Sequence, residues 1–303
     1  KLKRSFPTIP IIALTATADK LVRQDIVERL NINKAKVFVS SFNRPNIYYA
    51  VEPKRNSYSQ LLNFLDKHKD NSGIIYCLSR KSVENMALDL QSEGFSVLPY
   101  HAGLDKETRD NNQNLFVKDD VKIIVATIAF GMGIDKPDVR FVIHHDIPKS
   151  LESYYQETGR AGRDGGEGYC LAYYSYKDVE KLEKFMSGKP VAEQEIGFAL
   201  LQEVVAYAET SMSRRKFLLH YFGEEFDSET GDGADMDDNV RNPKSKVEAQ
   251  DQVVKLLEVV RDTKHLYKSK EVIYTLIGRV NAVINAHRTD AQQFFGSGKD
   301  FEE

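Results

Sequence analysis

The feature that most constrains the fold of this chain is the regular alternation of short apolar runs with amphipathic stretches between residues 57 and 174. In the stretch 58–68, for example, Leu61, Leu62 and Leu65 share one helical face. The runs that predict strands are residues 73–77, 97–100, 121–126, 139–144 and 168–174, and the stretches that predict helices are 58–68, 81–93 and 106–117. This alternation predicts an α/β fold with a parallel, doubly wound sheet.

The two ends of the chain have different patterns. Residues 10–15 and 37–39 are apolar and predict two more short strands, with a helix between them that ends near residue 30. Beyond residue 190 the predicted elements are helices, at 196–208, 213–221 and 247–264. Residues 224–242 are polar, rich in Asp and punctuated by Gly, which predicts a loop.

Composition sets outer limits on function. The 303 residues carry a formal net charge of −3, so any contact with nucleic acid must come from local basic patches. No apolar run approaches the ~18 residues that a membrane span requires. Both cysteines, Cys77 and Cys170, lie in strand-like apolar stretches. This placement predicts buried free thiols in a reducing, intracellular compartment.

A second informative feature is the segment 153–165, which reads SYYQETGRAGRDG. Within a helix, the spacing of Arg160 and Arg163 would place both guanidiniums on one face. Gly159 and Ala161 would allow another surface to approach them closely. Forked guanidinium donors suit phosphate oxygens, and they stabilise charge in phosphoryl transfer when supplied across an interface. The alternative for this segment alone is a pair of solvated arginines at a helix end.

Other blocks accompany this segment in a fixed order. They are ALTATA at 13–18, FNRPN at 42–46, IYCLSR at 75–80, YHAGL at 100–104 and VATIAFGMGIDKP at 125–137. Together with residues 153–165 they resemble motifs III to VI of superfamily 2 helicases, and their amino-acid sequences resemble those of the RecQ family. The resemblance covers residues 13 to 165 and implies RecA-like domains.

The resemblance implies that the nucleotide is ATP with Mg²⁺, held mainly by the first of two RecA-like domains. Arg160 and Arg163 would face the triphosphate, with Arg163 as the arginine finger, and Gln156 would couple hydrolysis to domain closure. Asp135 and Gly133 would lie at the nucleotide, with Asp135 near its ribose or near the segment 153–165, which resembles motif VI. The alternative for Asp135 is a turn aspartate with a local capping role.

The resemblance also implies that a DNA backbone crosses the ends of the strands. Thr127, Ser79 and Arg80 are the candidate phosphate contacts, with His101 and the amide of Gly103 close by. Such contacts position a strand without reading its bases, which suits a translocating motor. For Arg80, a surface ion pair is the alternative.

Two motifs of an ATP-hydrolysing motor do not occur in these 303 residues: Gly-x-x-x-x-Gly-Lys-Ser/Thr, and an acidic box of the Asp-Glu-x-His kind. The first cradles phosphates and the second holds magnesium. We therefore expect that this chain corresponds to the C-terminal part of a motor, that its partner is a missing first RecA-like domain, and that it is inactive alone.

The region after residue 190 departs from the family in one respect. Many RecQ proteins carry four zinc-binding cysteines there, whereas here Ser213 precedes Arg214 and Arg215, and residues 230–240 contain neither Cys nor His. Zinc requires about four nitrogen or sulfur ligands, so we expect a helical hairpin without zinc. Asp235, Asp237 and Asp238 raise the alternative of a calcium site, although acidic loops are commonly just solvated.

The resemblance divides the chain into four parts. They are the end of a first RecA-like domain (1–41), a second RecA-like domain (42–186), a helical subdomain equivalent to the RecQ zinc-binding domain (187–245) and a partial winged helix, or RQC segment (246–303). The implied activity is that of an ATP-dependent 3′-to-5′ DNA helicase, which translocates on single-stranded DNA and unwinds forked DNA in repair and recombination. It would act in the cytoplasm, nucleoid or nucleus. The alternatives are a superfamily 2 RNA helicase and a degenerate, non-catalytic DNA-binding module.

Overall fold

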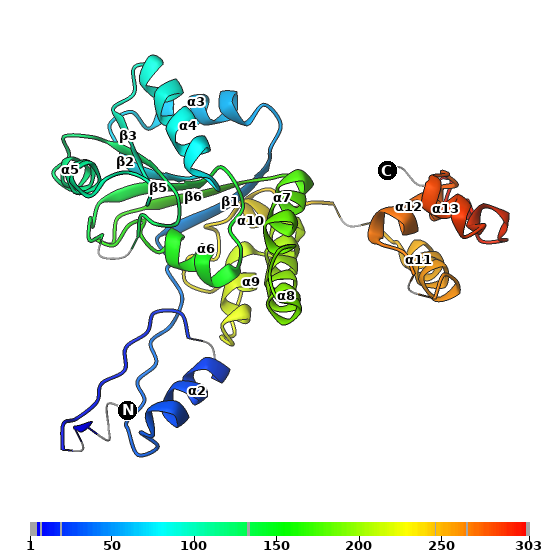
Figure 1. Cartoon of the computed structure of the whole chain (residues 1–303), viewed down its shortest axis with the longest axis horizontal. Coiled ribbons are helices and arrows are strands. Elements are labelled where there is room, and N and C mark those ends of the chain that lie inside the picture. Colours follow the sequence, from blue (N-terminus) through cyan, green and yellow to red (C-terminus); the bar gives the residue numbers. More distant parts are fainter. Residues whose placement is uncertain are drawn as a thin grey trace. The chain divides into compact units, whose positions relative to one another are not determined.

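A parallel sheet of six strands forms the centre of the first of two units, Lys1–Lys244, in a computed structural model of the chain. The structure describes residues 5–6, 8–18, 20–131, 134–245, 247–264 and 266–300. The strands are β1 (Ile47–Pro53), β2 (Ser72–Tyr76), β3 (Val97–Tyr100), β4 (Ile123–Ala126), β5 (Val139–His144) and β6 (Gly168–Tyr174). They lie in the order β1-β6-β5-β2-β4-β3, and each neighbouring pair is parallel (Figure 1). The predicted α/β fold is confirmed.

Helices cover both faces of the sheet, because successive residues of a strand point to opposite sides. In β2, Ile74 and Tyr76 belong to one hydrophobic core and Ile75 to the other. Helices α3 (Ser57–Lys67) and α4 (Arg80–Ser92) pack on the Ile75 side (Figure 1). The opposite side is covered by α5 (Lys106–Val117), α6 (Leu151–Thr158), α7 (Tyr176–Met186), α8 (Val191–Glu209) and α9 (Arg214–Tyr221).

Short polar side chains set the starts of several helices. Ser79, Asp105 and Ser150 directly precede α4, α5 and α6, and each accepts a hydrogen bond from the backbone N–H three residues later. Such a cap satisfies a donor that the helix itself cannot pair. Helix α5 occupies the predicted range, and α4 begins one residue earlier than predicted.

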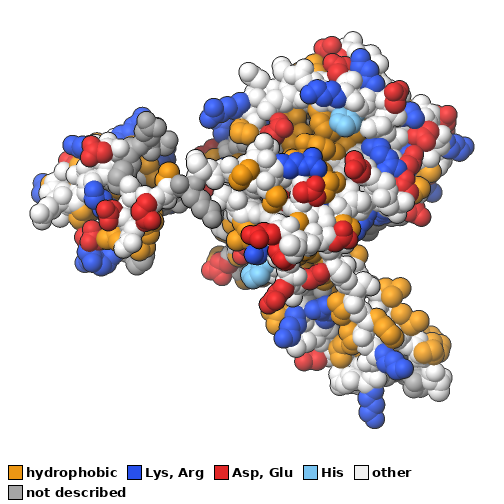
Figure 2. Space-filling model, turned by 180° about the vertical axis from the view of Figure 1, so that it is seen from behind, with side chains coloured by type: hydrophobic (Ala, Val, Ile, Leu, Met, Phe, Trp, Pro, Cys, Tyr) orange, Lys and Arg blue, Asp and Glu red, His pale blue; other side chains and the backbone are white. Residues whose placement is uncertain are grey.

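The N-terminal segment differs from the sequence prediction. Residues 10–15 and 37–39 form no strand, and α2 (Lys20–Leu30) between them buries none of its residues. Ile12, Leu14 and Phe38 are 82%, 91% and 88% exposed, and Figure 2 shows hydrophobic side chains gathered on this segment. The two predicted strands are wrong for the chain as described, because a strand needs a neighbour for its N–H and C=O groups and the described residues offer none there.

The second unit, Ser245–Glu303, is helical in the part that is described. Its elements are α11 (Gln250–Asp262), α12 (Ser269–Ile277), α13 (Ala282–Ala286) and a 3-10 turn at Thr289–Ala291. Val259, Val272 and Leu276 form its small core. In neither unit does a described helix have the length and apolar character that a bilayer crossing requires.

Candidate nucleotide and DNA interface

The predicted phosphate-binding segment consists of α6 and the turn that follows it. The helix ends at Thr158, whose Oγ1 donates back to a main-chain carbonyl one turn earlier at 2.8 Å. Gln156 lies exposed in the last helical turn, and Arg160 and Arg163 come after the helix. The condition under which both guanidiniums would share a helix face is therefore not met, because the helix ends before either arginine.

Arg160 is buried, with 6% of the residue exposed. Its Nη1 donates to the carbonyl oxygen of Gly131 at 2.7 Å. A Cβ at Gly131 would lie 2.4 Å from Nη2 of Arg160, so a larger residue there would require the guanidinium to move. Arg160 thus joins the turn after α6 to the loop after β4. Met132 and Gly133 of that loop lie outside the described residues, so the predicted site residue Gly133 has no described position.

Arg163, in contrast, lies partly at the surface. Its Nη1 donates to the carbonyl oxygen of Ile134 at 2.9 Å and to Oδ1 of Asp135 at 3.3 Å. The Arg163 side chain is 35% exposed and the Asp135 side chain 90%. Within the described part of the chain both bonds use Nη1, so the other N–H groups of the fork can bind an anionic ligand such as a nucleotide phosphate.

The predicted DNA contacts come from three neighbouring strands. β2, β4 and β3 are adjacent and parallel, so their carboxyl ends lie at the same edge of the sheet. Thr127 directly follows β4, and its backbone N–H donates to the last carbonyl of β3 at 3.2 Å. Ser79 and Arg80 follow β2, and His101 and Gly103 follow β3. The structure therefore brings all five predicted residues to one edge.

Local contacts hold several of these residues in place. Oγ of Ser79 accepts from the backbone N–H of Ser82 at 3.1 Å, and Oγ1 of Thr127 accepts from a backbone N–H at 3.4 Å. Arg80 is exposed, and its Nη1 lies 3.0 Å from where a Cβ of Gly103 would be. Glycine at 103 therefore lets the Arg80 side chain lie close against the backbone.

His101 differs from the other four because it is buried, with 2% of the residue exposed. Its Nδ1 accepts from the backbone N–H of Gly103 at 3.1 Å, and its Nε2 lies 3.0 Å from Oε1 of Glu84. An imidazole that accepts at Nδ1 carries its proton on Nε2, which can then donate to the carboxylate. Both ring nitrogens are engaged within the protein, so His101 holds Gly103 in place.

Sequence reasoning missed the contacts that hold the turn after α6. The guanidinium of Arg44 donates to the carbonyl oxygens of Gly159, Ala161 and Gly162 at 3.2, 3.0 and 3.0 Å. Nδ2 of Asn46 also donates to the Gly162 carbonyl, at 2.8 Å. The FNRPN run was the one signal in the sequence, but it did not indicate which residues it contacts.

The subdomain that precedes residue 245 is held by hydrogen bonds between acidic and polar side chains. Asp237 is fully buried and accepts from Oγ of Ser213 at 2.6 Å and from the backbone N–H of Val240 at 2.9 Å. Asp238, the first residue of α10 (Asp238–Arg241), pairs with Nε of Arg214 at 2.8 Å. These carboxylates are occupied by protein donors, and among the described residues the group of possible metal ligands lies elsewhere. The residues therefore do not fit zinc, and they do not support the calcium alternative.

A group of possible metal ligands occurs elsewhere in the described chain, where atoms of Cys77, His145 and Asp146 lie within 4.8 Å of one another. The Asp146 carboxylate is already engaged: Oδ1 lies 2.7 Å from Nζ of Lys54, and Oδ2 accepts from the backbone N–H of Leu78 at 3.0 Å. Because an ammonium at this distance opposes a second cation, we assign no metal here.

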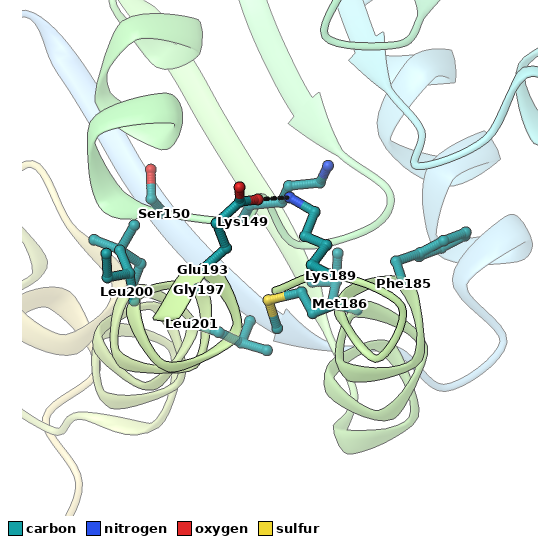
Figure 3. Close-up of a pocket in the computed structure, with 11 residues that line it drawn as sticks. Lys149, Ser150, Phe185, Met186, Lys189, Glu193, Gly197, Leu200 and Leu201 are labelled. Carbon is teal, nitrogen blue, oxygen red and sulfur yellow. Dashed lines mark ion pairs between the residues drawn. The ribbon is translucent and has the colours of Figure 1, made fainter. Parts of the chain in front are cut away.

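An apolar pocket of about 300 Å³ lies where α7 and α8 meet (Figure 3). Phe185, Met186 and Leu200 line it, and Lys189 and Glu193 form an ion pair of 3.8 Å beside it. None of the predicted nucleotide or DNA residues lines this pocket. The candidate interface is therefore a surface made by loops and strand ends and is separate from this hollow.

Comparison with known proteins agrees with this geometry. The model of the helicase conserved C-terminal domain matches residues 55–165, and the RecQ zinc-binding model matches residues 176–239. The ATP-dependent DNA helicase RecQ of Pasteurella multocida is 41% identical over 300 residues, which cover 99% of this chain and 47% of that protein. The ATP-dependent DNA helicase hus2/rqh1 of Schizosaccharomyces pombe is 50% identical over 231 residues, which cover 75% of this chain and 17% of that protein. A structure of S. cerevisiae Dbp5 bound to RNA and ADP BeF3 matches in fold, with a TM-score of 0.52 and 20% identity over 66% of this chain and 57% of that one.

The parallel sheet and the match over residues 55–165 place this part of the chain in the class of helicase conserved C-terminal domains. The similarity continues through the zinc-binding region and along nearly the whole chain. The chain therefore carries the C-terminal region of a RecQ-family helicase. It spans about half the length of its bacterial relative and less of the yeast one.

Proposed function

We propose that this chain supplies the part of an ATP-dependent DNA helicase that completes the ATP site and guides single-stranded DNA. The observation that carries this proposal is the placement of Arg163, a partly exposed guanidinium beside Asp135 on a turn held by hydrogen bonds. The bacterial relative that aligns along nearly the whole chain is named a DNA helicase. This relationship favours DNA as the substrate.

The nucleotide is ATP with Mg²⁺, bound mainly by a first RecA-like domain. When that domain closes on this one, Arg163 donates to phosphate oxygens and stabilises the charge that develops in phosphoryl transfer. Asp135 orients Arg163, and the exposed Gln156 couples closure to hydrolysis. Arg160 acts indirectly, because it is buried and holds Gly131 of the loop after β4.

The DNA backbone passes over the carboxyl edge of β2, β4 and β3. Arg80 supplies positive charge, while Ser79, Thr127 and the amide of Gly103 supply hydrogen bonds to phosphate oxygens. His101 supports Gly103 from below the surface. Contacts of this kind do not select a DNA sequence, which suits translocation along a strand. We propose that this translocation runs 3′ to 5′, is driven by cycles of ATP hydrolysis, and separates forked duplexes in repair and recombination.

We also propose a four-part organisation. Residues 1–41 complete a first RecA-like domain, 42–186 form the second, 187–245 form the helical subdomain and 246–303 form a partial winged helix. The exposed side chains of Ile12, Leu14 and Phe38 support the first of these assignments. Exposed apolar side chains favour burial against another surface, and the sheet of a first RecA-like domain would provide it. The protein would act where DNA is found, in the nucleoid or the nucleus.

The test is the ATPase rate of this chain, alone and mixed with a separately produced first RecA-like domain of the family, with and without single-stranded DNA. We expect no Mg²⁺-dependent rate from the chain alone, since its sequence contains no Gly-x-x-x-x-Gly-Lys-Ser/Thr motif to bind the phosphates. The mixture should be active and stimulated by DNA. Arg163→Ala should lower kcat by at least about 10³-fold, and Arg55→Ala, at another exposed arginine, should not change it. A silent mixture of domains that demonstrably associate would contradict the proposal.

We further propose that the helical subdomain folds without zinc, supported by the Ser213–Asp237 and Arg214–Asp238 contacts. The purified protein should contain far less than one zinc per chain, and a chelator should leave its Tm unchanged. Asp237→Ala should lower the free energy of unfolding by about 1–3 kcal/mol, because the buried Ser213 hydroxyl and the backbone N–H of Val240 lose their acceptor. A Tm that falls by several degrees on chelation would refute the zinc-free assignment.

A further inference from the structure

Arg44 binds the turn after α6 through main-chain carbonyls. Its guanidinium donates to the carbonyl oxygens of Gly159, Ala161 and Gly162 at 3.0–3.2 Å. Carbonyls at the end of a helix lack partners within the helix and carry partial negative charge, so a cation is favourable there. Gly162 has φ +56°, and a Cβ on it would lie 2.5 Å from Nδ2 of Asn46. The turn thus has a specific backbone shape that Arg44 and Asn46 enclose.

Arg44 is itself held in place by Arg215 of α9. Nη1 of Arg215 donates to Oδ1 of Asn43 and to the carbonyl oxygen of Arg44, both at 2.7 Å. Nη2 donates to the carbonyl of Ile47 at 2.6 Å, and Nε donates to the carbonyl of Gly233 at 2.9 Å. Arg215 is only 2% exposed. One buried guanidinium therefore joins the Asp-rich loop to the start of β1.

Aromatic packing also joins the segment before β1 to α6 and to the helical subdomain. The ring of Phe42 stacks on Phe222, which follows α9, with ring centroids 4.6 Å apart and planes 9° apart. It also meets Tyr155 of α6 edge-on at 5.8 Å. The hydroxyl of Tyr155 donates to the Phe42 carbonyl at 2.8 Å. Residues 42–47 are consequently packed between α6 and the helical subdomain.

We propose that Arg215 and Arg44 form a positioning relay, through which the helical subdomain sets the conformation of the turn that presents Arg163. This inference rests on the role proposed above for Arg163. Neither arginine touches the nucleotide in this scheme. Arg215 fixes the backbone of residues 43–47, Arg44 fixes three carbonyls of the turn, and the turn fixes Arg163. The relay gives the hairpin subdomain a part in ATP hydrolysis without any contact with the substrate.

The first test measures hydrogen–deuterium exchange in the full chain, which needs no ATPase activity. Arg44→Lys and Arg215→Lys keep the charge but lose the fork that binds several carbonyls at once. We expect the amides of residues 159–166 to exchange about tenfold faster in both variants, while β2 and β4 keep their protection. Arg55→Lys is the matched control and should match the wild type. Unchanged exchange in the turn would overturn the relay, as would faster exchange throughout the sheet.

The second test is a double-mutant cycle in the reconstituted ATPase. If Arg44 acts through Arg163, Arg44→Lys should lower kcat by about tenfold or more with little change in the KM for ATP. The same change should cost nothing further in an Arg163→Ala background. An equal loss in both backgrounds would overturn the relay. A silent wild-type mixture would count against the proposed function instead, and the exchange experiment would then decide the relay on its own.

Discussion

Arg160 and Arg163 lie three residues apart, yet their surroundings differ in solvent exposure and in the groups they contact. Arg160 is buried, and its donor Nη1 is committed to the Gly131 carbonyl. Arg163 keeps 35% of its side chain exposed. A buried guanidinium without hydrogen-bond partners destabilises the fold strongly, whereas the ion pair of an exposed guanidinium contributes little to the free energy of folding. Replacing Arg160 should therefore mainly lower the stability of the fold, and replacing Arg163 should mainly lower the proposed activity.

We expect Arg160→Ala to lower the free energy of unfolding by about 2 kcal/mol, because the substitution leaves a cavity and removes the partner of the Gly131 carbonyl. Arg163→Ala should change the free energy by no more than about 0.5 kcal/mol. Urea unfolding of both variants, followed by circular dichroism, measures the difference. Equal losses of stability would contradict the separation of a structural arginine from a catalytic one.

At the scale of elements, β2 to β6 could be predicted because each has its own apolar run, and α4 and α6 because a polar residue caps each of them, whereas β1 was not predicted. Ser79 and Ser150 illustrate this, since each caps the helix that follows it. Whether residues 10–15 and 37–39 form strands could not be predicted from their apolar runs alone. An apolar run specifies a strand only when another strand lies beside it, and that condition is not local. The end of α6 before Arg160 was also missed, because helical spacing does not show where a helix ends.

A buried carboxylate joins several elements at the carboxyl edge of the sheet. Asp146, just after β5, contacts Nζ of Lys54 at 2.7 Å, and the same ammonium reaches Asp178 of α7 at 3.0 Å. Burial alone would raise the pKa of the Asp146 carboxyl. The hydrogen bond from His145 and the charge of Lys54 outweigh that effect and hold the pKa well below its usual range. A lowered pKa in the folded state stabilises the fold above the ordinary value of about 4, and this stabilisation is lost as the pH falls below it.

Asp146→Asn should therefore lower the free energy of unfolding by about 3 kcal/mol at pH 7, since it removes one partner of a buried pair. The difference in the free energy of unfolding between variant and wild type should become smaller as the pH falls below about 4, where the wild-type carboxylate begins to be protonated and its stabilising effect declines. Urea unfolding at a series of pH values provides the measurement. Asp66→Asn, at an exposed ion pair with Lys69, should show neither effect. A gap that stays constant with pH would show that Asp146 does not titrate in this way.

At the scale of the whole molecule, the candidate site combines local motifs with contacts between distant parts of the chain. The arginine-bearing turn and the strand-end residues could be recognised because each motif is contiguous. The partners of Arg44 and Arg215 could not be recognised, because Arg44 reaches carbonyls 115 to 118 residues away and Arg215 reaches Arg44 across 171 residues. Contacts of this kind arise only when the sheet and the helical subdomain pack together.

The division into two units also makes a prediction. Both large cores of the first unit are made from residues between 47 and 221, and the small core of the second from residues between 259 and 294. Stability follows the apolar area that each core removes from water. A chain that ends at Lys244 should therefore keep the main calorimetric transition within about 2 °C of its value in the full chain. In the full chain, Leu276→Ala should shift a separate, lower transition and leave the main one unchanged. A main transition that falls by many degrees on truncation would show that the first unit depends on the second.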